Sequence, residues 1–135
     1  MFTVKRKQTF EYAHRLMSHE GNCRFLHGHS GEAEVEIAVC TLDDQGMVID
    51  FAQLKRAMSS LLEAWDHTTL LQKNDPLKPA LLLLGQRVYT FEEQPTAEVM
   101  ARELYNHLQT FFPGSVKTVT ISETRNNRAT FTGIS

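Results

Sequence analysis

A thiol and two imidazoles lie close together in the segment Cys23-Arg24-Phe25-Leu26-His27-Gly28-His29. Because His27 and His29 are two positions apart, their side chains leave the same face of an extended backbone. Both share the odd parity of the apolar residues of 33–39, so they would point toward the buried side if the extended backbone continues unbroken through Gly28 and Gly31. Neutral imidazole nitrogens are common zinc ligands, and a third imidazole, His14, lies at the end of the preceding predicted strand. The sequence therefore predicts a zinc site made of His14, His27 and His29.

The thiol of Cys23 leaves two interpretations of this site open. As a fourth ligand, Cys23 would close a tetrahedral structural site in which no position remains for a substrate. As a free thiol beside Arg24 and a metal ion, it would be readily deprotonated and would act as a base or nucleophile. The spacing of the residues allows both arrangements.

Two further features of the sequence suggest acid–base chemistry. Asp66 directly precedes His67, and a neighbouring carboxylate can hold an imidazole in the tautomer that a proton relay requires. Glu123 shares the odd parity of Val119 and Ile121, so its carboxylate falls on an otherwise apolar face at the end of a strand. Chance adjacency is the alternative for the Asp-His pair, and an exposed position at the rim of the sheet is the alternative for Glu123.

The elements that position these residues follow from the hydrophobic pattern. Residues 2–13 and 32–39 are predicted as strands, and in the second one Glu32, Glu34 and Glu36 form a wet, acidic face. Asp50 is predicted to cap a helix over residues 51–65.

Pro95-Thr96 opens a second predicted helix, which Pro113-Gly114 ends, and residues 115–124 and 128–134 form a hairpin. This order predicts an α+β fold, in which two helices inserted between strands 2 and 3 cover a four-stranded antiparallel sheet. In residues 72–95, Pro76 and Pro79 are expected to break regular structure, leaving a turn of helix and a short extended piece.

The length of 135 residues predicts a single domain over residues 1–135. Its 14 basic and 16 acidic residues are mixed along the chain, with a formal charge of -2, and this argues against nucleic acid as a partner. The longest apolar run, 80–84, is far shorter than the roughly 20 residues that cross a bilayer, so no membrane partner is expected. We expect a cytoplasmic protein with reduced cysteines.

Six motifs together resemble one known family. They are Phe10-Glu11-Tyr12-Ala13-His14-Arg15-Leu16, Cys23-Arg24-Phe25-Leu26-His27-Gly28-His29, Val48-Ile49-Asp50-Phe51, Trp65-Asp66-His67, Gln94-Pro95-Thr96-Ala97-Glu98 and Ser122-Glu123-Thr124. In this order they resemble the family of 6-pyruvoyl-tetrahydropterin synthases and 6-carboxy-tetrahydropterin synthases. The resemblance implies the tunnelling fold, in which the sheets of several subunits join into a barrel and sites form between neighbouring chains. It also implies a homo-oligomer, which we expect to be a hexamer.

The resemblance further implies roles for single residues. The zinc ligands of the family correspond to His14, His27 and His29, and its catalytic thiol corresponds to Cys23. The remaining correspondences are the relay pair Asp66 and His67, the pterin-anchoring glutamate Glu123, and Thr96 and Glu98 near the pterin. Ser30 and Phe25 depart from common family residues, and neither departure removes a catalytic group.

The implied substrate is the pterin 7,8-dihydroneopterin triphosphate. Three residues separate Cys23 from His27, and this short spacer resembles the 6-carboxy-tetrahydropterin synthases of queuosine precursor synthesis, whereas pyruvoyl-forming members typically have a longer one. We therefore expect zinc-dependent formation of 6-carboxy-5,6,7,8-tetrahydropterin, with release of acetaldehyde and triphosphate. The alternatives are a 6-pyruvoyl-tetrahydropterin synthase, a zinc-stapled binding module without activity, and a hydrolase that uses Cys23, His67 and Asp66.

Overall fold

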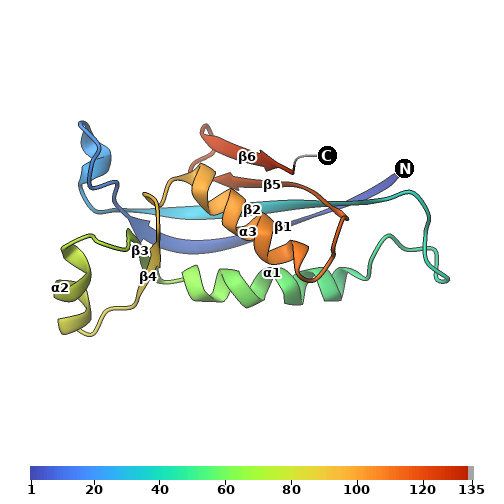
Figure 1. Cartoon of the computed structure of the whole chain (residues 1–135), viewed down its shortest axis with the longest axis horizontal. Helices are drawn as coiled ribbons and strands as arrows, with labels where there is room; N and C mark the ends of the chain where they lie inside the picture. The colour runs from blue at the N-terminus through green and yellow to red at the C-terminus, as the bar shows by residue number, and fades with distance from the viewer. Residues whose placement is uncertain (134–135) are drawn as a thin grey trace.

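The computed structural model describes residues 1–133, which form a curled six-stranded sheet with two long helices along one of its faces (Figure 1). In chain order the elements are β1 (Phe2–His14), the 3₁₀ turn η1 (Asn22–Arg24), β2 (His27–Val39), α1 (Phe51–Trp65), β3 (Thr68–Gln72), α2 (Leu77–Leu83), β4 (Val88–Phe91), α3 (Ala97–Gln109), β5 (Val116–Ser122) and β6 (Arg128–Thr132). The strand order across the sheet is β4-β3-β1-β2-β5-β6. The α+β class is confirmed. Ile134, the predicted end of the last strand, lies outside the described residues.

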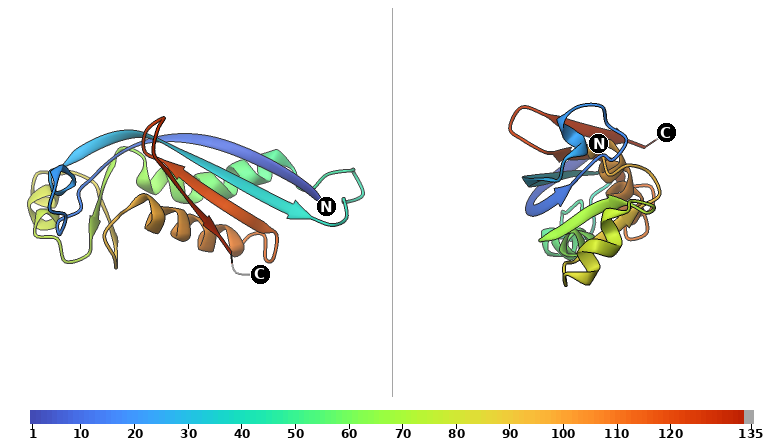
Figure 2. Two further views of the ribbon diagram at one scale, coloured as in Figure 1. Left: turned by 90° about the horizontal axis from the view of Figure 1, so that it is seen from above. Right: turned by 90° about the vertical axis from the view of Figure 1, so that its left-hand side faces the viewer.

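The long hairpin of β1 and β2 forms the centre of the sheet, and Figure 2 shows it as a bent ribbon. Its antiparallel pairing runs without interruption from Phe2 opposite Val39 to His14 opposite His27. The second strand therefore begins at His27, earlier than the alternation alone indicated. Gly31 permits this continuity, because a Cβ atom there would lie 2.7 Å from Cε1 of Tyr12.

The two long helices agree with the sequence prediction and cover the buried face of the sheet. Asp50 caps α1 by accepting a hydrogen bond of 2.8 Å from the backbone N–H of Ala52, and Thr96 caps α3 by accepting one of 3.1 Å from Val99. Between helices and sheet lies one apolar core, whose fully buried members include Val35, Leu54, Met58, Trp65, Leu104 and Ile121. Burial of this layer fixes which face of each strand points toward the helices.

The prediction of a four-stranded sheet is wrong, because β3 and β4 add two strands beside β1. β3 pairs in parallel with the end of β1, from Tyr12 opposite Thr68 to His14 opposite Leu70, and β4 pairs in parallel with β3. These strands have five and four residues, too few to show an alternating pattern. Their pairing brings the residues that follow α1 against β1.

The segment between β3 and β4 contains α2, a full helix where a helical turn was expected. Pro79 does not break it, because Pro79 lies in the first turn, where a backbone N–H has no intrahelical partner. Asp75, just before the helix, is buried and accepts hydrogen bonds from the guanidinium of Arg15 and from the N–H of Leu77 at 2.8 Å. This ion pair ties α2 to the end of β1.

The predicted acidic face of β2 is confirmed, although basic residues partly neutralise it. Lys7 lies 3.7 Å from Glu32 and 4.0 Å from Glu34, and Lys117 lies 3.6 Å from Glu36. None of the helices within residues 1–133 is both long enough and apolar enough to cross a membrane.

Candidate active site

Three histidines converge at the end of the β1–β2 hairpin. His14 ends β1, while His27 and His29 begin β2, and their candidate ligand nitrogens lie within 4.8 Å of one another. The ring centroids are 4.7 to 5.2 Å apart. Among residues 1–133, these three residues are the only cluster of three or more His, Cys, Asp or Glu side chains that could hold a metal ion. The convergence predicted for them is therefore confirmed.

Backbone carbonyl groups orient two of the three rings. Nδ1 of His14 donates to the carbonyl oxygen of Pro95 at 2.8 Å, and Nδ1 of His27 donates to that of Phe25 at 2.7 Å. These bonds assign the proton to Nδ1 and leave Nε2 with a free lone pair, as metal-binding histidines require. Nε2 of His29 is buried without a hydrogen-bond partner in the described chain. The donor set therefore fits a zinc ion with three nitrogen ligands.

Burial also favours the uncharged form of His14 and His29. Desolvation is the main cause that lowers the pKa of His14 to about 4, and the neighbouring His27 and His29 add to it. Desolvation likewise lowers the pKa of His29, against the opposing effect of the Glu123 carboxylate. Neutral rings at neutral pH are the form that binds a metal.

Glu123 lies directly beside this cluster. One carboxylate oxygen is 3.9 Å from Nε2 of His14 and the other is 3.8 Å from Nε2 of His29. The residue follows β5, and its side chain is 26% exposed, because it also lines a hollow shared with Glu98, Asn127 and Arg128. Glu123 is therefore only partly exposed, and its role at the site stays a prediction. Its carboxylate connects the hollow to the three histidines.

Tyr12 is a neighbour of the cluster that the sequence analysis did not single out. Its ring packs against His14 and His29, with centroids 5.2 and 5.6 Å away, and its hydroxyl is buried without a partner in the described residues. Desolvation, helped by the charge of Glu123, raises its pKa. Its parity with His14 on β1 was the signal that placed it there.

Cys23 lies in η1, outside the three-histidine group. The turn is joined to the end of β1 by a hydrogen bond of 2.8 Å from Leu16 N–H to the carbonyl oxygen of Cys23. The thiol is partly buried and forms no disulfide. The described structure therefore does not assemble the closed four-ligand site, which remains the alternative interpretation of this cysteine.

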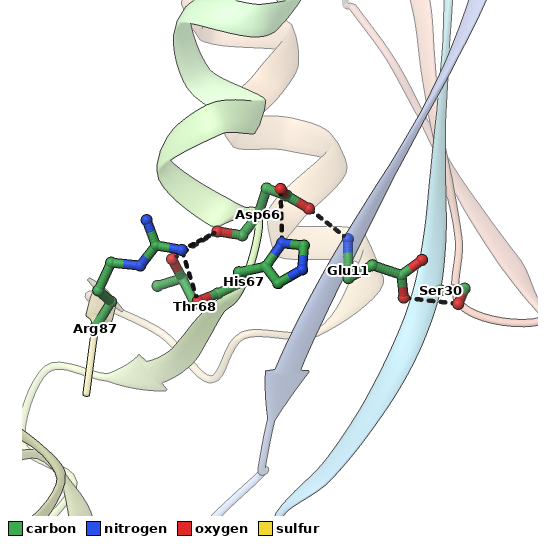
Figure 3. A network of polar contacts seen from close by, with 6 residues as sticks. All are labelled: Glu11, Ser30, Asp66, His67, Thr68 and Arg87. Atoms are coloured by element: carbon green, nitrogen blue, oxygen red, sulfur yellow. Dashed lines mark hydrogen bonds and ion pairs between the residues drawn. The ribbon is translucent and has the colours of Figure 1, made fainter. Parts of the chain in front are cut away.

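Asp66 and His67 form a hydrogen-bonded pair that is fixed to β1 (Figure 3). One oxygen of Asp66 accepts from Nδ1 of His67 at 2.8 Å, and the other accepts from the N–H of Glu11 at 2.8 Å. The N–H of His67 donates to the carbonyl of Glu11 at 2.6 Å. The Glu11 N–H is the largest cause that lowers the pKa of Asp66, and His67 contributes. The pair is thus held as carboxylate and oriented imidazole.

The Asp66–His67 pair is attached to Glu11, whose side chain leaves the opposite face of β1 from that of His14. His67 lines a pocket together with Glu11, Ser30 and His29, and the exposed side chains of Glu11 and Ser30 hydrogen-bond to each other at 2.7 Å. On β1, Glu11 alternates with the buried residues Tyr12 and His14, so it points away from the cluster. The three-histidine group does not include Asp66 or His67, and their joint action in one site stays a prediction.

Comparison with known proteins agrees with this geometry. The family described as 6-pyruvoyl tetrahydropterin synthase matches residues 3–133. The chain belongs to this family. The resemblance noted in the sequence is therefore confirmed over nearly the whole chain.

Several relatives of the family share most of their length with this chain. A 6-carboxy-5,6,7,8-tetrahydropterin synthase of Rickettsia typhi is 35% identical, over 93% of this chain and 96% of its own. A protein named probable 6-carboxy-5,6,7,8-tetrahydropterin synthase in Halobacterium salinarum is 39% identical, over 82% of this chain and 73% of its own. The solved 6-pyruvoyl tetrahydropterin synthase of Caenorhabditis elegans superposes with a TM-score of 0.77 at 28% identity, over 98% and 96% of the two chains.

The other two predicted site residues, Thr96 and Glu98, lie at the start of α3. Glu98 is exposed and lines the hollow beside Glu123. The hydroxyl of Thr96 accepts the capping hydrogen bond of α3, which is a structural use of that group. Its neighbour Pro95 supplies the carbonyl that orients His14. Backbone groups carry no sequence signal, so this role of Pro95 was not predictable.

Proposed function

We propose that this protein is a zinc-dependent 6-carboxy-5,6,7,8-tetrahydropterin synthase acting in queuosine precursor synthesis. The observation that carries the proposal is the position of the Glu123 carboxylate, which lies within 3.9 Å of two inward-facing histidines and also lines a hollow. A pterin held at Glu123 would present its side chain to the histidine cluster. The names of the relatives in Rickettsia typhi and Halobacterium salinarum support the carboxy product.

His14, His27 and His29 would hold the zinc ion. When bound, zinc would act as a Lewis acid for the hydroxyl groups of the substrate side chain. The chain itself prepares the site, because the carbonyls of Pro95 and Phe25 fix two ring tautomers and burial favours the neutral form of His14 and His29. These features do not require the metal to be present.

The substrate would be 7,8-dihydroneopterin triphosphate, bound through its pterin ring. Glu123 would accept two parallel hydrogen bonds from the guanidine-like N–H edge of the ring, an arrangement that fixes position and orientation. Glu98 lies in the same hollow and would face the ring or its solvent shell, while Thr96 positions the start of α3 nearby. The volume of the hollow, about 390 Å³, lies within the range of small-molecule sites.

The reaction would break the bond between the first and second side-chain carbons and release the triphosphate from the third. With one water consumed, the atoms balance as 6-carboxy-5,6,7,8-tetrahydropterin, acetaldehyde and triphosphate. The two electrons that reduce the ring come from the side chain, so no redox cofactor is needed. Cys23 would remove and return protons at the side-chain carbons, and His67, oriented by Asp66, would transfer protons on the opposite side.

We further propose that neighbouring chains complete each site in a cytoplasmic homo-oligomer, a hexamer by resemblance. The exposed Asp66–His67 pair, fixed to Glu11 on the strand whose alternate residue His14 points inward, supports this, since another subunit would cover the pair. The sheet edges at β4 and β6 also offer unpaired backbone groups that neighbouring subunits would cover, closing a barrel. A monomer of about 15.4 kDa in light scattering at micromolar concentration would contradict this assembly.

The main alternative is formation of 6-pyruvoyl tetrahydropterin, the product in the name of the Caenorhabditis elegans neighbour and of the family. The short spacer between Cys23 and His27 argues for the carboxy product, because each extended residue spans roughly 3.3–3.6 Å and so shifts the thiol along the substrate. Mass spectrometry of the products from 7,8-dihydroneopterin triphosphate decides between them. We expect 6-carboxy-5,6,7,8-tetrahydropterin and acetaldehyde, and 6-pyruvoyl-tetrahydropterin without acetaldehyde would overturn the proposal.

A non-catalytic zinc-stapled module is the alternative from a different class. A coordinated Cys23 would resist alkylation in the zinc-loaded protein, whereas a free thiol would react. A hydrolase using Cys23, His67 and Asp66 gives no role to the three histidines, so we do not favour it.

A further inference from the structure

Arg87 reaches the Asp66–His67 pair from a part of the chain that the proposed mechanism does not use. Its Nη2 atom donates to the carbonyl oxygen of Asp66 at 3.3 Å and to that of His67 at 3.2 Å (Figure 3). One guanidinium nitrogen therefore bridges two successive carbonyl groups. The side chain also lines the pocket that contains His67 and Glu11.

The backbone that Arg87 bridges has an unusual conformation. His67 has a φ of +53°. Among residues 1–133 it is the only residue other than glycine with a positive φ. Side chains disfavour this left-handed conformation, and such residues persist where surrounding contacts hold them. The contacts at His67 are the hydrogen bond of its N–H to Glu11 and the bridge from Arg87.

The backbone of Arg87 is held in place by a hydrogen bond to β3. Its carbonyl oxygen accepts a hydrogen bond of 3.1 Å from Thr69 N–H, at the start of the parallel pairing between β3 and β4. The chain turns back after α2 at Gly85, whose φ of +75° suits glycine, and the N–H of Gln86 returns to Leu81 at 2.9 Å. The segment from α2 to β4 thus presents Arg87 to His67 on a folded support.

The charge of Arg87 acts in the same direction as its hydrogen bonds. The Glu11 N–H and, to a smaller extent, the Arg87 cation hold the pKa of Asp66 below its ordinary value. A charged Asp66 accepts a hydrogen bond from Nδ1–H of His67. The other ring nitrogen, Nε2, is then left as the proton acceptor. Arg87 therefore stabilises both the turn and the tautomer of His67.

We propose that Arg87 is a positioning residue for His67, and that through it the α2–β4 segment forms part of the active site. This inference rests on the proposed role of His67 in catalysis. Arg87 would not contact the reacting atoms. It would instead set the direction in which Nε2 of His67 points.

The test compares Arg87→Ala and Arg87→Lys with a control, Lys73→Ala, which removes an exposed cation of the same segment that pairs with Glu92. NMR of the ¹⁵N-labelled imidazoles, assigned with His67→Asn, reports the tautomer of His67 without any substrate. We expect Arg87→Ala to lower the Nδ1–H population of His67, Arg87→Lys to restore part of it, and Lys73→Ala to leave it unchanged. An unchanged tautomer in Arg87→Ala would overturn the proposal.

Steady-state kinetics provide the second readout. Arg87→Ala should lower kcat by roughly 10- to 100-fold, since misplacing a catalytic group by about 1 Å can cost about 100-fold, while KM changes less than about twofold. A raised KM with unchanged kcat would overturn positioning and indicate that Arg87 binds the substrate anion instead. If the wild-type protein forms no pterin product, the proposed function fails, but the NMR result still decides the role of Arg87.

Discussion

Nδ1 of His14 lies 2.8 Å from the carbonyl oxygen of Pro95, a residue 81 positions further along the chain. This hydrogen bond joins the end of β1 to the start of α3 and fixes both the tautomer and the orientation of the ring. With the pKa of His14 lowered to about 4, mainly by burial, the lone pair of Nε2 is available at neutral pH. The histidine cluster is therefore organised by the folded chain before a metal arrives.

Removal of a single histidine should remove the metal. We expect His27→Ala and His29→Ala to lose zinc and activity together, because two nitrogen ligands hold the ion poorly. Metal analysis of the purified variants and a turnover assay measure the two effects. Treatment of the wild-type protein with a chelator should abolish turnover, and added zinc should restore it.

Replacement of the thiol should separate metal binding from activity. We expect Cys23→Ala to keep one zinc per chain and to lose turnover, because Cys23 lies outside the three-histidine group. The same metal analysis and assay apply. Loss of zinc and of the folded state in Cys23→Ala would instead establish the closed structural site.

Glu123→Gln should weaken substrate binding while keeping the shape of the side chain. A hydrogen bond to a charged group contributes about 1.5–3 kcal/mol, so we expect KM to rise roughly 10- to 100-fold. Glu63→Gln, an exposed position on α1, is a matched control that should leave KM unchanged. An unchanged KM in Glu123→Gln would remove Glu123 from the pterin site.

The histidine cluster was predictable because it depends on local periodicity. His27 and His29 share one face of a strand, and a hairpin brings the end of the preceding strand alongside them, so the pairing of His14 with His27 follows from elementary geometry. The helix over 51–65 was equally clear from its stripe and from Asp50. In these cases short-range patterns decide the structure.

The support of the Asp66–His67 pair was not predictable, because it depends on contacts between distant segments. β3 and β4 are short and obtain their pairing from the tertiary structure, and Arg87 reaches His67 only after α2 has folded. The hydrogen bond from Glu11 N–H to Asp66 joins residues 55 positions apart. The opposite parity of Glu11 and His14 on β1 could have indicated that their side chains lie on different faces of the sheet.

Asp75→Asn should destabilise the fold at neutral pH. Asp75 is buried and Arg15 is partly buried, and because removing one partner of a fully buried pair costs roughly 3–5 kcal/mol, we expect a smaller loss here, of about 2–3 kcal/mol. Chemical denaturation monitored by circular dichroism measures the free energy of unfolding. Glu92→Gln, in an exposed ion pair, should change it by no more than about 0.5 kcal/mol.

The same pair predicts the pH dependence of this difference. The hydrogen bond from Arg15 holds the pKa of Asp75 below its ordinary value of 3.8. A carboxyl group with a lowered pKa in the folded state stabilises the fold above its unfolded pKa and loses that contribution as the pH falls through the folded pKa. The gap in stability between wild type and Asp75→Asn should therefore be constant near neutral pH and shrink as the pH drops below 3.8. A gap that persists unchanged in acid would indicate that packing, and not charge, is responsible.

Two inactive variants should restore activity when they assemble together, if neighbouring chains complete the site. His27→Ala keeps the Asp66–His67 pair intact, and His67→Ala keeps the histidine cluster intact, so a mixed oligomer contains interfaces where both intact halves meet. We expect co-refolded mixtures to recover part of the wild-type turnover, with native mass spectrometry confirming mixed assembly. A mixture of His27→Ala with His29→Ala, both damaged in the same half, should remain inactive. Mixed oligomers without recovered turnover would show that each chain uses its own His67.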